Sequence, residues 1–331
     1  MAPIQRHAGL TALDTVSTVV RMLGIEGLAP TAAAELYLTM AALLVLCFFI
    51  GMAAVVAGVG GGVMFVPLTT ALFAIHVDFI RGAGLMVALV GAIAAAPALL
   101  RKRLGHPGVS IPLALSGSVG SIVGARIGLV VPERGILIAL GVLMIGVAVQ
   151  TVVQARIAHR RSTFDSGATA HTTPTDAHPT PRRLSARLAR AWGLYGVFED
   201  PADRSQVRWE VQRLIPALLL FVGVGAIGGM LGVGAGWANV PVLVTVMGLP
   251  VKMAAATSGL IILANSSAAS WVYLRNGAMD PLIVVPAVSG MIAGTQIGAR
   301  LLGRASPGAV RALIVVVLSV AGIRTLWGAL G

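Results

Sequence analysis

Two glycine-rich segments are the parts of this chain whose residues are best suited to bind a small anion. A run of glycines breaks a helix, and the helix that restarts after the break presents unpaired backbone N–H groups and the positive end of its dipole. Two such ends that meet would bind an anion without any fixed charge. The glycines that we take as candidate binding residues are Gly58, Gly60, Gly61, Gly62, Gly232, Gly234 and Gly236. Close packing of helices through small residues is the structural alternative.

Uncharged polar side chains follow the second glycine segment. Asn239 comes directly after it, and Thr257, Ser258 and Asn265 lie inside the next apolar run. Ser258 and Asn265 are seven residues apart (265 − 258) and therefore share a face of a helix. Hydroxyl and amide groups donate hydrogen bonds to an oxyanion without trapping it by full charge, so we take these four residues as candidate ligands. Hydrogen bonding between neighbouring helices is the alternative role.

Two arginines, Arg126 and Arg300, each follow a stretch of small residues near the end of an apolar run. Such an arginine either attracts anions into a cavity or extends along the helix to reach the membrane surface. We include both as candidate anion-binding residues and keep the second role open.

Catalytic groups are missing from the interior of the apolar runs. The acidic residues and histidine closest to them, His76, Asp78, Glu133 and Asp280, all fall near the ends of these runs. Hydrolytic and metal enzymes need a nucleophile with a base, or a set of metal ligands, and neither is in view. We therefore predict that the protein is not an enzyme and that it has no catalytic residue, metal site or cofactor.

The elements that must position the binding residues are membrane helices. The chain of 331 residues is 57% hydrophobic and 11% charged, with a mean hydropathy of +0.91, which is typical of a polytopic membrane protein. Its net charge of +12 reflects Lys and Arg in cytoplasmic loops rather than affinity for nucleic acid. Apolar runs lie at 36–57, 82–100, 108–131, 135–153, 214–231, 253–274, 281–299 and 312–330, and shorter ones at 63–77 and 237–249.

The second half of the chain repeats the first. Gly232 follows Gly58 by 174 residues (232 − 58), and the same offset relates Arg101 to Arg275, Pro107 to Pro281 and Arg126 to Arg300. We expect an all-α polytopic fold of two homologous repeats with glycine-broken helices, inverted relative to each other if each has five segments. If 63–77 and 237–249 are re-entrant, the repeats become parallel units of four spans. Inversion would make Lys252 and Arg300 cytoplasmic, so the charge distribution favours it.

The repeats and the linker divide the chain into four parts. Residues 1–34 form an amphipathic interfacial segment, 35–154 the first transmembrane repeat, 155–212 a basic cytoplasmic linker and 213–331 the second transmembrane repeat. We expect arginines between Arg182 and Arg190 to contact anionic lipids, or else to belong to a solvated tether.

The repeated motifs resemble the TauE/SafE sulfite exporter family, also called the 4-toluene sulfonate uptake permease family. The resemblance rests on AGVGGGVMFVPLTTALF and LGVGAGWANVPVLVTVMGLP, and it continues into AATSGLIILANSSAASWVYLRNG. It implies a multi-pass permease of the cell inner membrane that moves small sulfur anions such as sulfite or sulfonates. In this family a Thr-Ser or Thr-Asn pair follows the first motif, but here Ala83-Gly84 stands in its place, so the first half is expected to contribute backbone more than hydroxyls.

Export of a small sulfur oxyanion by alternating access is the function that we expect. Each negative charge that moves out of a negative cytoplasm releases about 2.3 kcal/mol per 100 mV, so an exporter needs no coupling ion. The alternatives are coupled uptake of a sulfonate or other organic anion, and a membrane scaffold that transports nothing.

Overall fold

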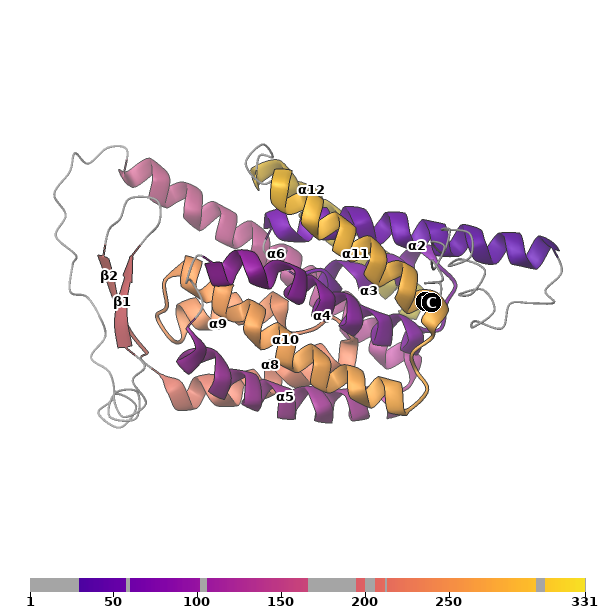
Figure 1. Ribbon diagram of the computed structural model, residues 1–331, viewed down its shortest axis with the longest axis horizontal. Helices are drawn as coiled ribbons and strands as arrows, with labels where there is room; N and C mark the ends of the chain where they lie inside the picture. The colour runs from indigo at the N-terminus through magenta and orange to yellow at the C-terminus, as the bar shows by residue number, and fades with distance from the viewer. Residues whose placement is uncertain are drawn as a thin grey trace, which may run out of the picture.

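A computed structural model describes residues 30–57, 60–101, 106–165, 195–199, 206–211, 213–301 and 307–330. These residues form ten helices and one two-stranded antiparallel sheet. Most of the helices lie side by side along the longest axis of the molecule (Figure 1).

The helices of the second half begin at the positions that the repeat predicts. The first half contains α2 (Pro30–Ala57), α3 (Gly62–Leu72), α4 (Val77–Arg101), α5 (Pro107–Val130) and α6 (Glu133–Asp165). The second half contains α8 (Leu214–Leu231), α9 (Gly236–Thr245), α10 (Val251–Arg275), α11 (Pro281–Leu301) and α12 (Pro307–Leu330). The starts of α3, α4, α5 and α6 each recur 174 residues later (236 − 62, 251 − 77, 281 − 107, 307 − 133). Proline at the first helical position, as in α5 and α11, fixes these starts because it pre-sets the helical φ.

Six of the helices in the described part of the chain are long and apolar enough to cross a membrane, which indicates a multi-pass membrane protein. They are α2, α4, α5, α6, α8 and α11. Helix α10 has 25 residues, but its serine, threonine and asparagine side chains lower its hydropathy. Helices α3 and α9 have 11 and 10 residues and therefore rise only about 16 Å, roughly half the hydrocarbon thickness.

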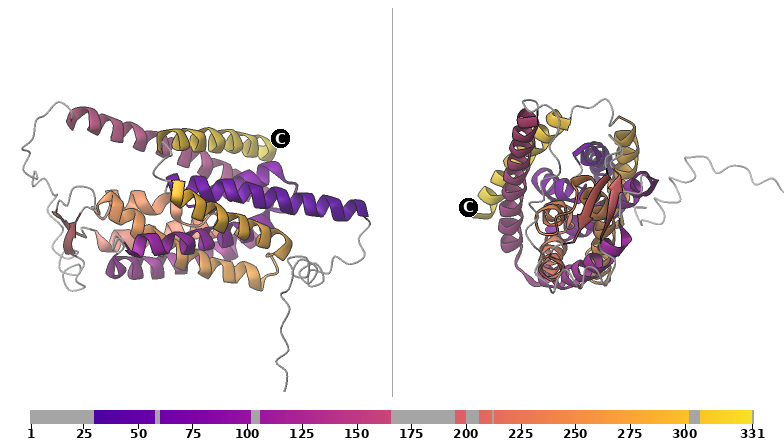
Figure 2. Two further views of the ribbon diagram at one scale, coloured as in Figure 1. Left: turned by 45° about the horizontal axis from the view of Figure 1, so that its top comes forward. Right: turned by 90° about the vertical axis from the view of Figure 1, so that its left-hand side faces the viewer.

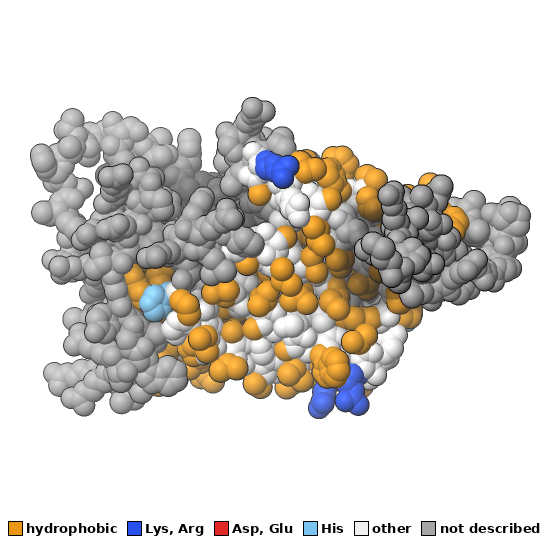
Figure 3. All heavy atoms as spheres, viewed as in Figure 1, with side chains coloured by type: hydrophobic (Ala, Val, Ile, Leu, Met, Phe, Trp, Pro, Cys, Tyr) orange, Lys and Arg blue, Asp and Glu red, His pale blue; other side chains and the backbone are white. Residues whose placement is uncertain are grey.

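The surface agrees with a lipid environment. Hydrophobic side chains cover most of the described face in Figure 3, and the Lys and Arg side chains visible there lie at its edges. Large apolar residues such as Leu115 and Leu219 are 65% and 71% exposed. An apolar surface of this extent needs lipid tails around it.

Helices α2 and α8 run in opposite directions along the molecule, and so do α6 and α12. In Figure 1, α2 begins at the right-hand end of the molecule, whereas α8 begins at the left-hand end beside the two strands. Likewise α6 ends at the left, and α12 ends at the right, where the C-terminus is marked (Figures 1 and 2).

The helix pairs between the halves repeat the same contacts. A Cβ on Gly120 of α5 would overlap the Val222 backbone of α8, and a Cβ on Gly294 of α11 would overlap the Phe48 backbone of α2. Gly294 and Val222 are the counterparts of Gly120 and Phe48 at the offset of 174 (294 − 120, 222 − 48). The glycines therefore allow two equivalent helix pairs to pack backbone against backbone.

Adding a methyl group at this contact is expected to destabilise the bundle. A Gly120→Ala variant should unfold at a lower temperature in detergent, by a cost of about 1–3 kcal/mol, because the new Cβ forces α5 away from Val222. Gly223→Ala on α8 is the matched control, since nothing lies within 4 Å of a Cβ at that position. Equal unfolding temperatures for the two variants would show that the close approach contributes nothing to stability.

The linker differs from the prediction. Helix α6 continues to Asp165, eleven residues beyond 154 (165 − 154), and the linker also contains strands β1 (Tyr195–Glu199) and β2 (Gln206–Glu210). The strands pair antiparallel with Tyr195 opposite Glu210, so the wholly helical prediction was wrong for this part. Strand β1 contains Tyr195, Val197 and Phe198, and β2 alternates Val207 and Trp209 with polar residues; aromatic and β-branched residues of this kind favour strands.

Two predicted interfacial segments lie mostly or wholly outside the described residues. Residues 1–29 are outside them, and α2 begins at Pro30, so residues 30–34 belong to the first long helix. The stretch Arg182–Arg190 also lies outside the described part of the chain.

Candidate anion-binding site

The two glycine segments break the helices as expected and contact each other. In the first, Gly60 has a φ of +86° and α3 begins at Gly62; in the second, Gly232 and Gly234 have φ values of +72° and +69° and α9 begins at Gly236. These left-handed conformations favour glycine, which has no Cβ. A Cβ on Gly62 would lie 2.7 Å from the carbonyl oxygen of Val233, so the start of α3 abuts the second break.

Small residues of α4 separate the second break from bulkier groups. A Cβ on Gly84 would meet the Gly232 carbonyl, and a Cβ on Gly234 would lie 3.2 Å from the Cβ of Ala88. Gly84 and Ala88 therefore make room for the second break.

Polar side chains with buried, unpartnered atoms lie on α9 and α10, the two helices that follow the second break. We define the donor cluster as Trp237 and Asn239 of α9 with Asn265 and Ser266 of α10. Asn239 and Ser266 are fully buried and Asn265 is 2% exposed. Among the described residues no hydrogen-bond partner reaches the indole nitrogen of Trp237, either polar atom of the Asn239 amide, the Nδ2 of Asn265 or the hydroxyl of Ser266. Two more hydroxyls of α10, those of Thr257 and Ser270, are also buried and unpartnered.

The donor cluster is held in place by contacts to both halves. The Ser266 hydroxyl would lie 3.3 Å from a Cβ on Gly234, and the Asn265 amide packs on Gly117 of α5. Ser121 of α5 donates a hydrogen bond of 2.9 Å to the Asn265 carbonyl, and the Ser118 hydroxyl lies 3.4 Å from Asn265 Oδ1. The side-chain oxygen of Asn265 therefore accepts a hydrogen bond, whereas its NH₂ group has no partner among the described residues.

Unpaired buried donors are available to a water or a ligand with acceptor atoms. A buried amide or hydroxyl without a hydrogen bond costs about 1–3 kcal/mol, so native proteins pair nearly all of them. The indole N–H, the two amide NH₂ groups and the hydroxyl donate, and among the free atoms only Asn239 Oδ1 and the hydroxyl oxygen accept. The donor cluster is thus suited to a ligand rich in oxygen acceptors, such as a hydrated oxyanion.

The first half has no equivalent cluster. The counterparts of Asn239, Asn265 and Ser266 at the offset of 174 are Phe65, Gly91 and Ala92. Where Asn265 packs on Gly117, the counterpart Gly91 receives the thioether of Met291, which also reaches Gly61. An apolar side chain therefore takes the position that the amide holds in the second half.

The structure separates the predicted site residues into three groups. Gly62 meets Val233 of the second segment, whereas Gly60 lies near Ile262 and Gly61 near Met291; Gly58 lies outside the described residues. Asn239, Thr257, Ser258 and Asn265 are all buried. Arg126 and Arg300 lie on the exposed faces of α5 and α11, apart from the donor cluster, which fits the membrane-surface role.

Sequence reasoning missed several residues, above all Arg81. This arginine of α4 is 0% exposed, and its Cα and Cβ contact Gly232. A lone arginine beside the apolar run 82–100 was the available signal. Trp237 and Ser121 were also missed; Ser121 recurs as Thr295 in the second half (295 − 121 = 174), so the repeat pointed to that hydroxyl position.

Comparison with known proteins finds similarity to membrane transporters. The family model described as "Sulfite exporter TauE/SafE" matches residues 43–325. A "Probable membrane transporter protein YunE" from Bacillus subtilis (strain 168) is 22% identical over 292 residues, which are 86% of this chain and 96% of that protein. No solved structure gives a significant match.

Proposed function

The chain belongs to the TauE/SafE family of membrane transporters, and we propose that it exports a small sulfur oxyanion, such as sulfite or an organosulfonate, by alternating access. The observation that carries this proposal is the donor cluster of Trp237, Asn239, Asn265 and Ser266, whose buried donors lack partners beside a glycine-broken helix. Uncharged donors of this kind bind an oxyanion and also release it, as a transporter requires.

Alternating access requires two structural units that can rock against each other around one site. The opposite directions of α2 and α8, and of α6 and α12, support an inverted repeat (Figure 1). The reciprocal contacts Gly120–Val222 and Gly294–Phe48 support a twofold relation between the halves, because each half makes the same contact with the other.

One substrate site, rather than two, follows from the difference between the halves. The second half supplies amide, indole and hydroxyl donors, whereas the first supplies Phe65, Ala92 and the small residues that admit the second break. The first half acts through the start of α3, whose dipole points its positive end at the same junction.

Orientation in the inner membrane follows from the positive residues. Gly120 of α5 contacts Val222 of α8, and Gly124 contacts Ala226, so residue numbers increase in the same direction along both helices. Helix α5 therefore runs parallel to α8 and begins at the linker end of the molecule. The basic sequence Arg101-Lys102-Arg103 just before α5 and the arginine-rich linker thus belong to one side, which we take as cytoplasmic.

The direct test is efflux from proteoliposomes loaded with sulfite, sulfate, thiosulfate or taurine, under an imposed potential and without a pH gradient. Export without a coupling ion predicts selective flux that rises with the potential, since the potential acts on the moving charge. Flux that needs a proton or sodium gradient would favour coupled uptake. Absence of flux of every anion under both conditions, in folded protein, would favour a scaffold.

Two adjacent serines test whether the donor cluster is the site. Ser266→Ala should lower flux at low substrate about tenfold, because it removes a hydrogen bond to a charged ligand worth about 1.5–3 kcal/mol. Ser267→Ala is the matched control, since the Ser267 side chain is exposed and its hydroxyl already donates to the carbonyls of Leu263 and Ala264. Equal flux in both variants would remove Ser266 from the site.

A further inference from the structure

Arg81 is a fully buried cation that the donor cluster does not include. It lies in the second turn of α4 and contacts Gly232, the first left-handed residue of the second glycine break. A charged side chain inside a membrane protein is costly and is retained where it binds a partner or a passing ion.

The guanidinium is only partly paired. Its Nη2 lies 2.7 Å from Asp78 Oδ1 and donates a 3.0 Å hydrogen bond to the Gly128 carbonyl. Its Nε and Nη1 are buried and have no acceptor among the described residues. Because an arginine has five N–H donors, the pairing at Nη2 leaves the N–H of Nε and the NH₂ group of Nη1 without an acceptor.

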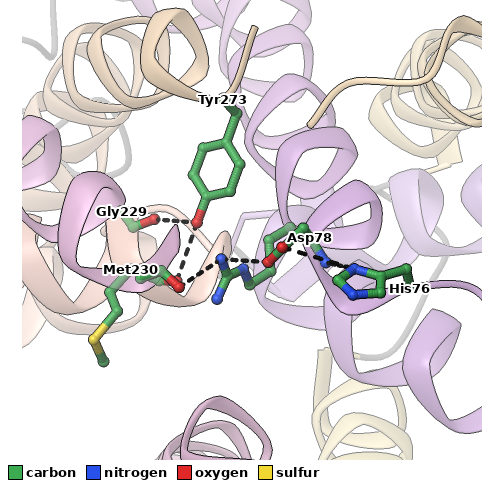
Figure 4. Close-up of polar contacts among 7 residues, drawn as sticks. His76, Asp78, Gly229, Met230 and Tyr273 are labelled. Atoms are coloured by element: carbon green, nitrogen blue, oxygen red, sulfur yellow. Dashed lines mark hydrogen bonds and ion pairs between the residues drawn. The ribbon is translucent and has the colours of Figure 1, made fainter. Parts of the chain in front are cut away.

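Tyr273 of α10 lies against the guanidinium. The Cζ of Arg81 is 5.4 Å from the centroid of the Tyr273 ring, and the Tyr273 hydroxyl donates to the carbonyls of Gly229 and Met230, each at 3.2 Å (Figure 4). The tyrosine thus holds the guanidinium in place, while Nε and Nη1 keep no acceptor among the described residues.

The short turn of the second break connects this arginine to the donor cluster. Gly232 at one end of the turn contacts Arg81, and Gly234 at the other end contacts Ser266. On the far side, Asp78 is 33% exposed and His76 is 57% exposed in their side chains, so the ion pair reaches the surface. Helix α4 leads to the basic segment at the linker end, so its start lies at the opposite end of the molecule.

We infer that Arg81 is a second oxyanion-binding residue between the donor cluster and the face away from the linker, and that Asp78 is the internal counter-ion with which the anion competes. The inference rests on the proposed function, which supplies the oxyanion that Arg81 would bind. An oxygen of a sulfite or sulfonate group can accept a charge-assisted hydrogen bond from Nε or from Nη1, the two nitrogens that have no acceptor among the described residues. Asp78 neutralises the arginine and so keeps it from holding the anion too tightly.

The arrangement exists in one half only. The counterparts of Asp78, Arg81 and Tyr273 at the offset of 174 are Lys252, Ala255 and Leu99. The second half therefore has a lysine but no arginine–aspartate pair at the equivalent positions, so the two ends of the site differ. A purely structural ion pair would not need the unpartnered Nε and Nη1.

The experiment measures anion binding and flux separately. Purified Arg81→Gln, Arg81→Lys and Asp78→Asn variants are compared with the wild type and with Arg134→Gln, which changes an exposed arginine in the first turn of α6. Binding is the sulfite concentration that gives half of the maximal rise in unfolding temperature in detergent, with sulfate, thiosulfate and taurine as further probes. Flux is measured in proteoliposomes.

Opposite shifts are expected for the two members of the ion pair. Arg81→Gln should raise the half-maximal concentration at least about tenfold, and Arg81→Lys should raise it less, because a lysine keeps the charge but not the fork. Asp78→Asn should lower it severalfold, since the competing carboxylate is gone. Arg134→Gln should leave it unchanged.

Three outcomes decide the matter. A folded Arg81→Gln or Arg81→Lys variant that binds as the wild type does, or a folded Asp78→Asn variant that binds more weakly, would overturn the inference. No anion-induced rise in the wild type would overturn it as well. An Arg81-dependent rise without flux of any anion would support the inference and contradict the proposed function instead.

Discussion

Replacing Asn239 with leucine is expected to reduce transport about 10- to 100-fold without destabilising the protein. The Asn239 side chain is fully buried and neither of its polar atoms has a partner among the described residues. If its amide binds the anion, the variant loses hydrogen bonds to a charged ligand worth about 1.5–3 kcal/mol, and each 1.4 kcal/mol is tenfold in affinity. The measurement is sulfite flux at low concentration in proteoliposomes.

The stability of this variant distinguishes a binding residue from a structural one. An unpaired buried amide costs free energy in the empty site, so leucine of similar size should leave the unfolding temperature equal or higher. Thr245→Val is the matched control on α9, because Thr245 is exposed and its hydroxyl already donates to the Pro241 carbonyl. If the Asn239→Leu variant unfolds early and transports normally once folded, Asn239 serves packing and the site lies elsewhere.

Gly234→Ala should abolish most of the flux, whereas Gly277→Ala should not. Both glycines have nearly the same left-handed backbone, with φ values of +69° and +68°, so an alanine costs each about 1–2 kcal/mol of stability. Only at Gly234 does the new Cβ meet neighbours, 3.2 Å from Ala88 and 3.3 Å from the Ser266 hydroxyl; at Gly277 nothing lies within 4 Å. The difference in flux between the two variants therefore measures the effect on the site alone.

The control at Gly277 separates the effect of backbone strain on stability from the effect on transport. Thermal unfolding should show the same loss of stability for both variants, and a flux assay at matched folded protein should show at least about a tenfold difference, equivalent to 1.4 kcal/mol. Flux that falls equally in both variants would indicate that backbone strain anywhere in the bundle impairs transport, and the glycine break would lose its special role.

Much of the fold could be predicted because its signals are local. Glycine and proline end and start helices through their own φ preferences, so the breaks near Gly60 and Gly234 and the starts at Pro107 and Pro281 were readable in the chain. The offset of 174 residues related the two halves before any contact was known. The hairpin in the linker was missed because short aromatic and β-branched stretches compete with helical patterns at similar strength.

The chain by itself therefore determined where helices break and which residues carry hydrogen-bond donors. Only the tertiary structure decided which donors lack partners, because that depends on the helices that cross at each position. Asn265 packs on Gly117, and its backbone carbonyl accepts a hydrogen bond from Ser121, 144 residues away. Arg126 is also polar, but its side chain is exposed. Arg81 became visible in the same way, since its contact with Gly232 joins segments that no local pattern relates. Burial and pairing are properties of the packed bundle, and the period of a helix gives a side chain its face but not its neighbour.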